Sequence, residues 1–218
     1  MLNKNNFGYI TPSDFNLYAK QAQLEIFEEY FFRYNAAINA ENSRQSGTGY
    51  ADGSKSLQDV IDSFSVNEVL VSPYDLNILT YDLYQFSRVA FVGSPYEAEN
   101  VPNYKIPLLN ASHLTAPSLD FPAYTQNGAN IAMYPDTGND IDVTYIRLPL
   151  APNWTYIELQ NGEALFDQSS TSYQDFELPV EDEYRLVQKI CQYAGLTIRE
   201  PQVVQYVKQE ENETSMKG

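Results

Sequence analysis

The sequence predicts an α+β fold in which a long N-terminal helix and a C-terminal helix pack with a mostly antiparallel β region in the middle. Apolar residues recur at helical spacing near both ends of the 218-residue chain. Between these ends Val, Ile, Tyr and Thr become dense, and Pro, Gly and Asn interrupt them about every eight to twelve residues. The length suits one domain with a sizeable core, so we expect residues 1–218 to form a single domain.

The first helix is expected to fill most of residues 1–39. Thr11, Pro12 and Asp14 predict its start, because Thr caps a helix, Pro suits the first helical position and an acidic residue three positions after the cap completes a capping box. Two apolar stripes run along the helix. The first stripe consists of Phe15, Ala19, Ala22, Ile26 and Ala37, and the second, rotated by about 120°, of Leu24, Phe27, Phe31, Tyr34 and Ile38.

The second stripe is the candidate intersubunit face. One apolar stripe is enough to dock a helix on its own domain, so a second stripe indicates burial against another element or another subunit. A helix at the centre of its own fold would also carry two stripes, and this alternative stays open.

The segment that follows, residues 40–56, lacks periodicity and is rich in Gly and Ser, which predicts a flexible loop or arm. Residues 57–160 form the β-rich middle, which opens with a short helix carrying Val60, Ile61 and Phe64. The stretch 73–86 is ambiguous, because the sequence from Ser72 to Asp75 also resembles a helix start. Strands are expected near Glu68–Val71, Asn77–Tyr84, Arg88–Val92, Lys105–Leu108, Ile131–Tyr134, Ile141–Leu148 and Thr155–Leu159.

The C-terminal part begins with a polar loop at residues 160–177, and residues 178–207 are expected to be helical. Gly195 fits the position just after the last turn of the main helix. The polar composition of residues 208–218 predicts a disordered tail. The apolar face of this helix is expected to comprise Val180, Tyr184, Val187, Ile190, Cys191 and Ala194.

The composition excludes several function classes. A net charge of −16 with only 13 Lys and Arg residues argues against wrapping nucleic acid, because contacts to phosphates come from these side chains. No apolar run approaches the length of a membrane span, and the first ten residues lack the apolar core of a signal peptide, so we expect the protein to stay in the compartment where it is made. One Cys and one His cannot build a disulfide or a Cys/His metal site, and we expect no cofactor.

The triplet Asp136-Thr137-Gly138 matches the sequence around the catalytic carboxylate of aspartic proteases. Pro135 precedes it, polar residues follow it, and the second triplet that would complete the carboxylate pair is absent from the sequence. Pro, Asp and Gly in this order are typical of a turn, and we interpret the triplet as one. The lone His113 and Cys191 lack identifiable catalytic partners, so we predict no catalytic residue and no enzymatic activity.

Three segments, in the same order along the chain, resemble structural proteins of tailed phages of Bacteroidota, including the crAss-like phages. They are residues 11–35, residues 130–156 and residues 175–211. The residues that carry the resemblance in the middle segment are Tyr134, Pro135, Tyr145, Arg147, Pro149, Pro152 and Trp154. Those in the last segment are Gly195, Leu196, Arg199, Glu200 and Pro201.

This resemblance implies a virion structural protein that forms a ring of the head-to-tail connector, or neck, below the portal. Such rings are typically dodecameric, extend the DNA channel and join the capsid vertex to the tail. The implied partners are further copies of the chain, the portal protein and neighbouring ring or tail proteins. Genomic DNA would pass through the lumen without specific binding, and the protein would be assembled into the virion in the host cytoplasm. Alternatives are another tail or portal-vertex structural component, or a carbohydrate- or receptor-binding module.

Overall fold

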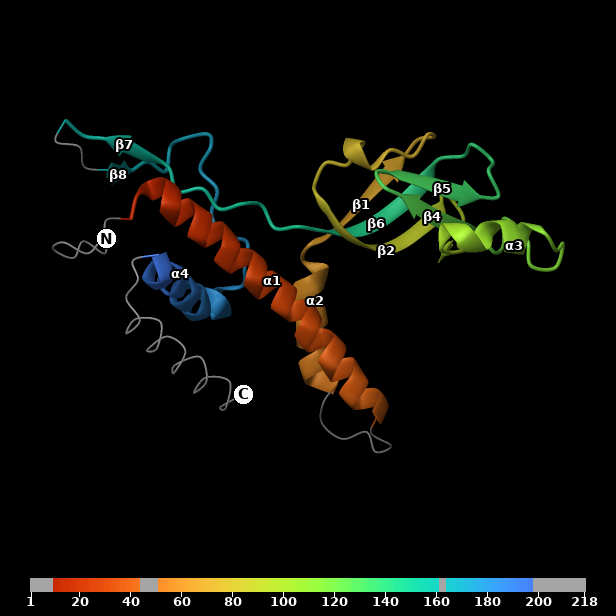
Figure 1. Ribbon diagram of the computed structural model, residues 1–218, viewed down its shortest axis with the longest axis horizontal. Helices are drawn as coiled ribbons and strands as arrows, with labels where there is room; N and C mark the ends of the chain where they lie inside the picture. The colour runs from red at the N-terminus through yellow and green to blue at the C-terminus, as the bar shows by residue number, and fades with distance from the viewer. Residues whose placement is uncertain (1–9, 44–50, 161–163, 198–218) are drawn as a thin grey trace. The chain divides into compact units, whose positions relative to one another are not determined.

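The computed structural model describes residues 10–43, 51–160 and 164–197 (Figure 1). It confirms the α+β prediction, with a helix towards each end of the chain and antiparallel strands between them. The chain divides into two compact units, whereas the sequence predicts a single domain. We call residues 61–148 the β unit and the described parts of residues 1–60 and 149–218 the helical unit. The division arises because the middle segment closes a hydrophobic core of its own.

Helix α1 spans Pro12–Ser43 and begins with the predicted capping box. The backbone amide of Asp14 donates to the hydroxyl oxygen of Thr11 at 3.2 Å. In return, the hydroxyl and the backbone amide of Thr11 donate to the carboxylate of Asp14 at 2.7 and 3.2 Å. These bonds satisfy amide groups that have no partner within the helix, and they fix its first turn at the residue that the sequence indicates.

Part of the predicted loop at residues 40–56 is helical. Helix α1 continues to Ser43, and helix α2 spans Ala51–Asp62. The apolar residues Leu57, Val60 and Ile61 recur at helical spacing. Once a helix has formed over them, adding preceding residues to it is favourable, so helix α2 extends towards the N-terminus into the predicted loop. Residues 44–50 lie outside the described part of the chain.

Helix α4 spans Glu183–Thr197 and follows the short 3-10 helix η3, Val180–Asp182. The predicted apolar face is only partly buried. Leu186 and Ala194 are buried, whereas Val180, Tyr184 and Val187 are exposed. The face that packs on α1 also carries Asp182, Arg185 and Lys189, which pair with polar groups of α1, so apolar periodicity alone misplaces it.

The end of α4 also differs from the prediction. Gly195 lies inside the helix rather than just after it. Residues 198–207 and the predicted tail at 208–218 lie outside the described part of the chain. Strands β7, Tyr156–Glu158, and β8, Ala164–Phe166, complete the helical unit as an antiparallel pair.

The β unit contains two three-stranded sheets. In the first, β6 (Ile141–Arg147) lies between β1 (Ser65–Leu70) and β2 (Leu83–Phe91), and both pairings are antiparallel. In the second, β4 (Ala123–Asn127) pairs in parallel with the short β3 (Glu99–Asn100) and in antiparallel with β5 (Asn130–Tyr134). Gly128, with φ of 61°, forms the tight turn between β4 and β5.

Side chains from both sheets form one hydrophobic core. Strand β6 alternates buried and less buried residues, so that one of its faces contributes three fully buried side chains. These are Ile141, Val143 and Tyr145. The core is completed by Leu70, Tyr74, Val89, Phe91, Ala98, Tyr124, Ile131 and Met133.

Most predicted strands are confirmed, with two exceptions. Of the predicted strand Asn77–Tyr84, only Leu83 and Tyr84 belong to a strand, β2. Asn77 and Ile78 belong to the 3-10 helix η1, Leu76–Ile78, because the carboxylate of Asp75 accepts from the amide of Asn77 at 2.9 Å and caps it. The predicted strand at Lys105–Leu108 is wrong. Residues Asn103–Lys105 form the 3-10 helix η2 and Ile106–Asn110 form helix α3, in which Pro107 occupies a position at the helix start that tolerates Pro. Strands β3, β4 and β8 are not among the predicted ones.

Candidate functional site

Asn16 on helix α1 ties the helix to the segment that follows Leu148. Its side-chain amide donates to the side-chain oxygen of Asn153 at 2.9 Å and to the carbonyl of Trp154 at 3.3 Å. The backbone amide of Trp154 donates back to Asn16 at 2.9 Å. The side chain of Asn16 therefore holds Asn153 and Trp154 through both its donor and its acceptor, and the arrangement is structural.

Gln23, seven residues further along the same helical face, makes the equivalent contact at greater depth. Only 1% of Gln23 is exposed. Its amide group donates to the carbonyl of Leu150 at 2.7 Å, and its oxygen accepts from the backbone amide of Glu177 at 3.0 Å. The carboxylate of Glu177 in turn accepts from the amide of Leu150 at 2.6 Å. One buried side chain thus joins three segments that are far apart in the sequence.

A network of charged side chains holds α4 against α1. The buried carboxylate of Asp182 accepts from the hydroxyl of Tyr30 and, at 2.9 Å, from the guanidinium of Arg185. The same guanidinium also donates to Glu29. With these partners the charge of Asp182 is compensated, which is what a buried structural carboxylate requires.

Glu25 forms a second part of this network. It accepts from the ammonium group of Lys189 at 2.8 Å and from the hydroxyl of Tyr193 at 2.6 Å. Burial raises the pKa of the Glu25 carboxyl, but the bonds from Lys189 and Tyr193 and the positive charges of Lys189 and Arg185 together hold it below its ordinary value. The carboxylate is therefore ionised at neutral pH and acts as an acceptor rather than as an acid.

An apolar groove lies beside this network within the helical unit, with a volume of about 490 Å³. Trp154 forms part of its wall and stacks on Tyr156 and Phe166 at ring distances of 5.7 and 6.2 Å, with Phe15 edge-on at 6.2 Å. Glu183 is the one charged side chain among the described residues that line the groove. The other lining residues include Phe15, Tyr18, Phe176, Leu186, Ile190 and Cys191. A surface of this kind suits apolar side chains better than a polar substrate.

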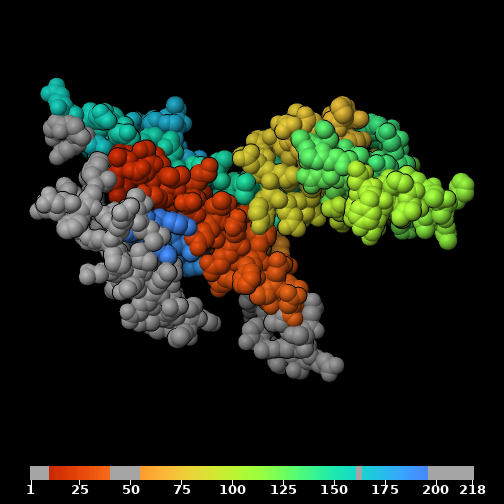
Figure 2. Space-filling view, viewed as in Figure 1, coloured from red at the N-terminus to blue at the C-terminus, as the bar shows by residue number. Residues whose placement is uncertain are grey.

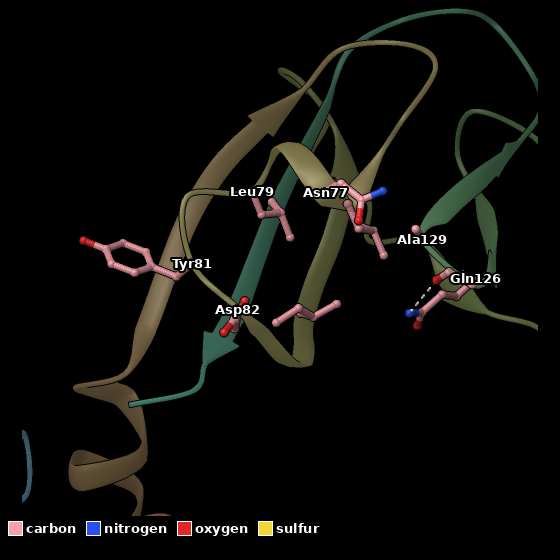
Figure 3. A pocket seen from close by; sticks show the side chains of 9 residues that line it. Asn77, Leu79, Tyr81, Asp82, Gln126 and Ala129 are labelled. Atoms are coloured by element: carbon pink, nitrogen blue, oxygen red, sulfur yellow. Dashed lines mark hydrogen bonds between the residues drawn. The ribbon is translucent and has the colours of Figure 1, made fainter. Parts of the chain in front are cut away.

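The β unit has a second, shallower pocket of about 400 Å³ between η1 and the β4–β5 turn (Figure 3). Its wall includes Asn77, Tyr81, Asp82 and Gln126, and the amide of Gln126 donates to the carbonyl of Gly128 at 3.4 Å. Asp82 is the single carboxylate in this lining, so the residues described here do not provide the carboxylate pair that glycoside hydrolysis uses.

Residues 103–122 of the β unit, which we call the apolar tip, expose large apolar side chains. Leu114 is 94% exposed and Phe121 is 79% exposed, and Tyr104, Leu108 and Leu119 are also more than half exposed. The segment includes helix α3, and its light green side chains form one end of the β unit in the space-filling view (Figure 2). Exposed apolar surface of this kind marks sites of interaction with other proteins.

The candidate intersubunit face on α1 is largely covered by the protein itself. Phe27 is only 1% exposed, and its ring meets that of Phe31 edge-on at 5.1 Å. Leu24, Tyr34 and Ile38 are half-buried, as is Phe31. The structure thus places these five residues on a helix face with little open surface, and the assignment of this face to a neighbouring subunit stays a prediction.

Asp136 lies in the exposed connection between β5 and β6. These strands belong to different sheets, so the connection is a turn between sheets and not a hairpin. Gly138 adopts a φ of 67°, and the hydroxyl of Tyr74 donates to the carbonyl of Asn139. Within the described residues no group of three His, Cys, Asp or Glu side chains gathers closely enough to hold a metal ion.

The residues that carry the phage resemblance have packing roles where the structure describes them. Tyr145 is fully buried, and its hydroxyl donates to Glu68 at 2.8 Å. The guanidinium of Arg147 lies over the rings of Phe64 and Tyr81, at 5.6 and 4.9 Å from their centres. Tyr145 and Arg147 of this motif thus pack in the core of the β unit and at its edge.

The apolar tip is the feature that the sequence analysis missed. The apolar residues of Lys105–Leu108 predict a strand. A strand at this position would pair with its neighbours and be covered, so the prediction gave no sign of an exposed apolar surface. The signal that distinguishes the tip is its low charge. Between residues 103 and 122 the sequence contains one Lys and one Asp, in a chain with 29 acidic residues.

Comparison with protein-family models finds no match for this chain, and comparison with curated proteins finds no relative of significant similarity. None of the helices in the described residues has the length and the apolar character to cross a membrane.

Proposed function

We propose that this protein is a virion structural protein that forms an oligomeric ring of the head-to-tail connector below the portal of a tailed bacteriophage. The observation that carries the proposal is the apolar tip. It places five large apolar side chains in solvent on a chain whose net charge is −16. Such a surface supports a role in protein assembly, because leaving it in water is unfavourable.

The tip is suited to docking because its backbone is ordered by hydrogen bonds. Ser118 and Phe121 exchange backbone hydrogen bonds at 3.1 and 3.2 Å, and the hydroxyl of Thr115 donates to the carbonyl of Leu109 at 3.0 Å. A segment that is already ordered loses little conformational entropy when it binds, which favours association.

The kind of assembly comes from the resemblance to phage neck proteins, and two properties support it. The net charge of −16 suits the wall of a channel through which DNA moves without adhering. Among the residues of the resemblance, Tyr145 belongs to the core of the β unit and Trp154 stacks on Tyr156 within the helical unit, as expected of a structural protein. In this proposal the ring extends the DNA channel, joins the capsid vertex to the tail, and contacts the portal protein and neighbouring ring or tail proteins. It is assembled in the host cytoplasm and remains in the virion.

The proposal is tested by quantitative peptide mass spectrometry on purified phage particles, with the portal protein as internal reference. We expect about one copy of this protein for each portal subunit. A ratio far from one would indicate another tail or portal-vertex component. Absence from the particles would refute the structural role, and binding of the free protein to host surface glycans would then point to a receptor-binding module.

A further inference from the structure

We propose that the apolar tip of one copy of this protein binds in the apolar groove of the helical unit of a neighbouring copy. The inference rests on the proposed ring function and names the contact that would build the ring. It uses the apolar tip and the apolar groove described above.

The tip has the form of a preorganised knob. Its base is anchored by Ile106, which is buried with Val101 and Ala123 in a small apolar cluster. Beyond this anchor, Leu114 and Phe121 are the most exposed of its large apolar side chains. The anchor fixes the base of the tip, so these side chains are presented to a partner on an ordered segment.

The groove has the complementary character. Its volume of about 490 Å³ lies within the range of pockets that enclose small ligands, about 300–1,000 Å³. Its wall combines the ring of Trp154 with aliphatic side chains of α4 such as Leu186 and Ile190. The centres of protein interfaces are apolar and rich in aromatic side chains, which fill pockets of this kind.

Charge favours this pairing over other contacts between two copies. Most surfaces of a chain with net charge −16 repel each other. The tip carries one cation, Lys105, and one anion, Asp120, and is neutral overall. The groove has a single charged lining residue, Glu183, which Lys105 can complement. A second copy of this chain therefore supplies an occupant that matches the groove in both polarity and charge.

The pairing also has the symmetry that a ring needs. Each copy carries one tip and one groove, and the two surfaces belong to different units of the chain. A contact between unlike surfaces leaves a free tip at one end and a free groove at the other, so copies add head to tail, and a ring forms where the rotation between neighbours closes. A contact between two tips would stop at a dimer.

The lone cysteine provides a direct test, because Cys191 lines the groove. The variant Leu114→Cys places a second thiol at the most exposed position of the tip, where the substitution should not disturb folding. Under a mild chemical oxidant we expect a ladder of disulfide-linked multimers on a non-reducing gel. The double variant Leu114→Cys/Cys191→Ser should give no ladder, and Thr137→Cys, which places a thiol in an exposed turn of the same unit, should give markedly less.

A second measurement does not depend on thiol chemistry. In sedimentation equilibrium over a concentration series, Phe121→Asp should weaken self-association at least about tenfold, because it places a carboxylate in an apolar groove. The variant His113→Asp adds the same charge to the tip without removing an apolar anchor and should have a smaller effect. Circular dichroism shows whether both variants keep the fold.

Three outcomes overturn the proposal. These outcomes are a wild-type protein that stays monomeric throughout the series, dimers that persist without Cys191, and a disulfide within one copy. If the particles contain one copy per portal subunit but no tip-to-groove disulfide forms, the ring is built through another surface. If the ladder forms but the particles lack the protein, the contact is correct and the neck assignment is wrong.

Discussion

Replacing Gln23 by Leu tests whether one buried amide holds the helical unit together. The substitution keeps the approximate size of the side chain but removes its donor and its acceptor. The carbonyl of Leu150 then loses a bond of 2.7 Å and the amide of Glu177 loses one of 3.0 Å. Both backbone groups lie in segments more than a hundred residues away from Gln23 in the sequence.

The expected loss follows from the two unsatisfied groups. Leaving a buried backbone group without a partner costs about 1–3 kcal/mol, so the two groups together give about 2–6 kcal/mol. The apolar side chain of Leu recovers part of this, about 1.5–3 kcal/mol when fully buried. Leu150 is exposed, so water can reach its surroundings, and this lowers the cost of the unsatisfied carbonyl further. We therefore expect the free energy of unfolding of the helical unit to fall by about 2 kcal/mol.

Urea unfolding followed by fluorescence measures this change. Trp154 is the only tryptophan in the chain and belongs to the helical unit, so its emission reports on that unit. The matched control is Gln21→Leu, an exposed position on the same helix, which should change the stability by less than about 0.5 kcal/mol. If the two variants unfold at the same urea concentration with the same slope, the amide of Gln23 does not hold the segments and the reasoning is refuted.

Three further predictions concern individual groups. Burial and the bond to Glu68 raise the pKa of Tyr145 to about 12. The stabilisation that the neutral hydroxyl provides should therefore be complete below the ordinary pKa of about 10 and decline as the pH rises towards 12. In urea unfolding, the stability difference between wild type and Tyr145→Phe should shrink over this interval, and a constant difference would contradict the assignment. The pKa of Glu25 lies below its ordinary value. The stabilisation that its carboxylate provides should therefore be present above about pH 4.3 and disappear as the pH falls through the lowered pKa of the folded protein. Glu25→Gln should reduce the free energy of unfolding by less than about 1 kcal/mol at pH 7, as the loss of an exposed ion pair does, and should have no effect in strong acid. In the capping box, Asp14→Ala should lower stability by about 1 kcal/mol in thermal denaturation. Lys20→Ala, at an exposed position of the same helix, should be nearly neutral, and equal losses would show that the box contributes little.

Features that depend on neighbours in the sequence were predictable here. Thr11 and Asp14 are three residues apart, so the capping box and the helix start could be predicted from spacing alone. The turn at Asp136 was predictable for the same reason, because Pro135 and Gly138 restrict the backbone locally. Strand β6 was predictable because its alternation of apolar residues extends over seven residues.

Features that depend on distant partners were not predictable from periodicity. The face of η3 and α4 that packs on α1 is set by Asp182, Arg185 and Lys189, whose partners on α1 lie more than 150 residues away. Apolar spacing therefore favoured the wrong edge of the helix, at Val180 and Tyr184. A stripe on α1 likewise does not show what covers it, so the assignment of that face to a neighbouring subunit stays a prediction. Exposure of the tip depends on the absence of a covering element, which one segment of sequence does not reveal.

The division of the chain also sets an order of events during synthesis. Residues 61–148 leave the ribosome as one continuous stretch and can fold as soon as they emerge, whereas α1 must wait for the partners that hold it. Gln23 and the amide of Glu177 are separated by 154 positions, which corresponds to about 8–30 s at about 5–20 residues per second. During this interval α1 exposes the apolar and polar face that later becomes buried. The net charge of −16 disfavours contact between nascent chains during this interval.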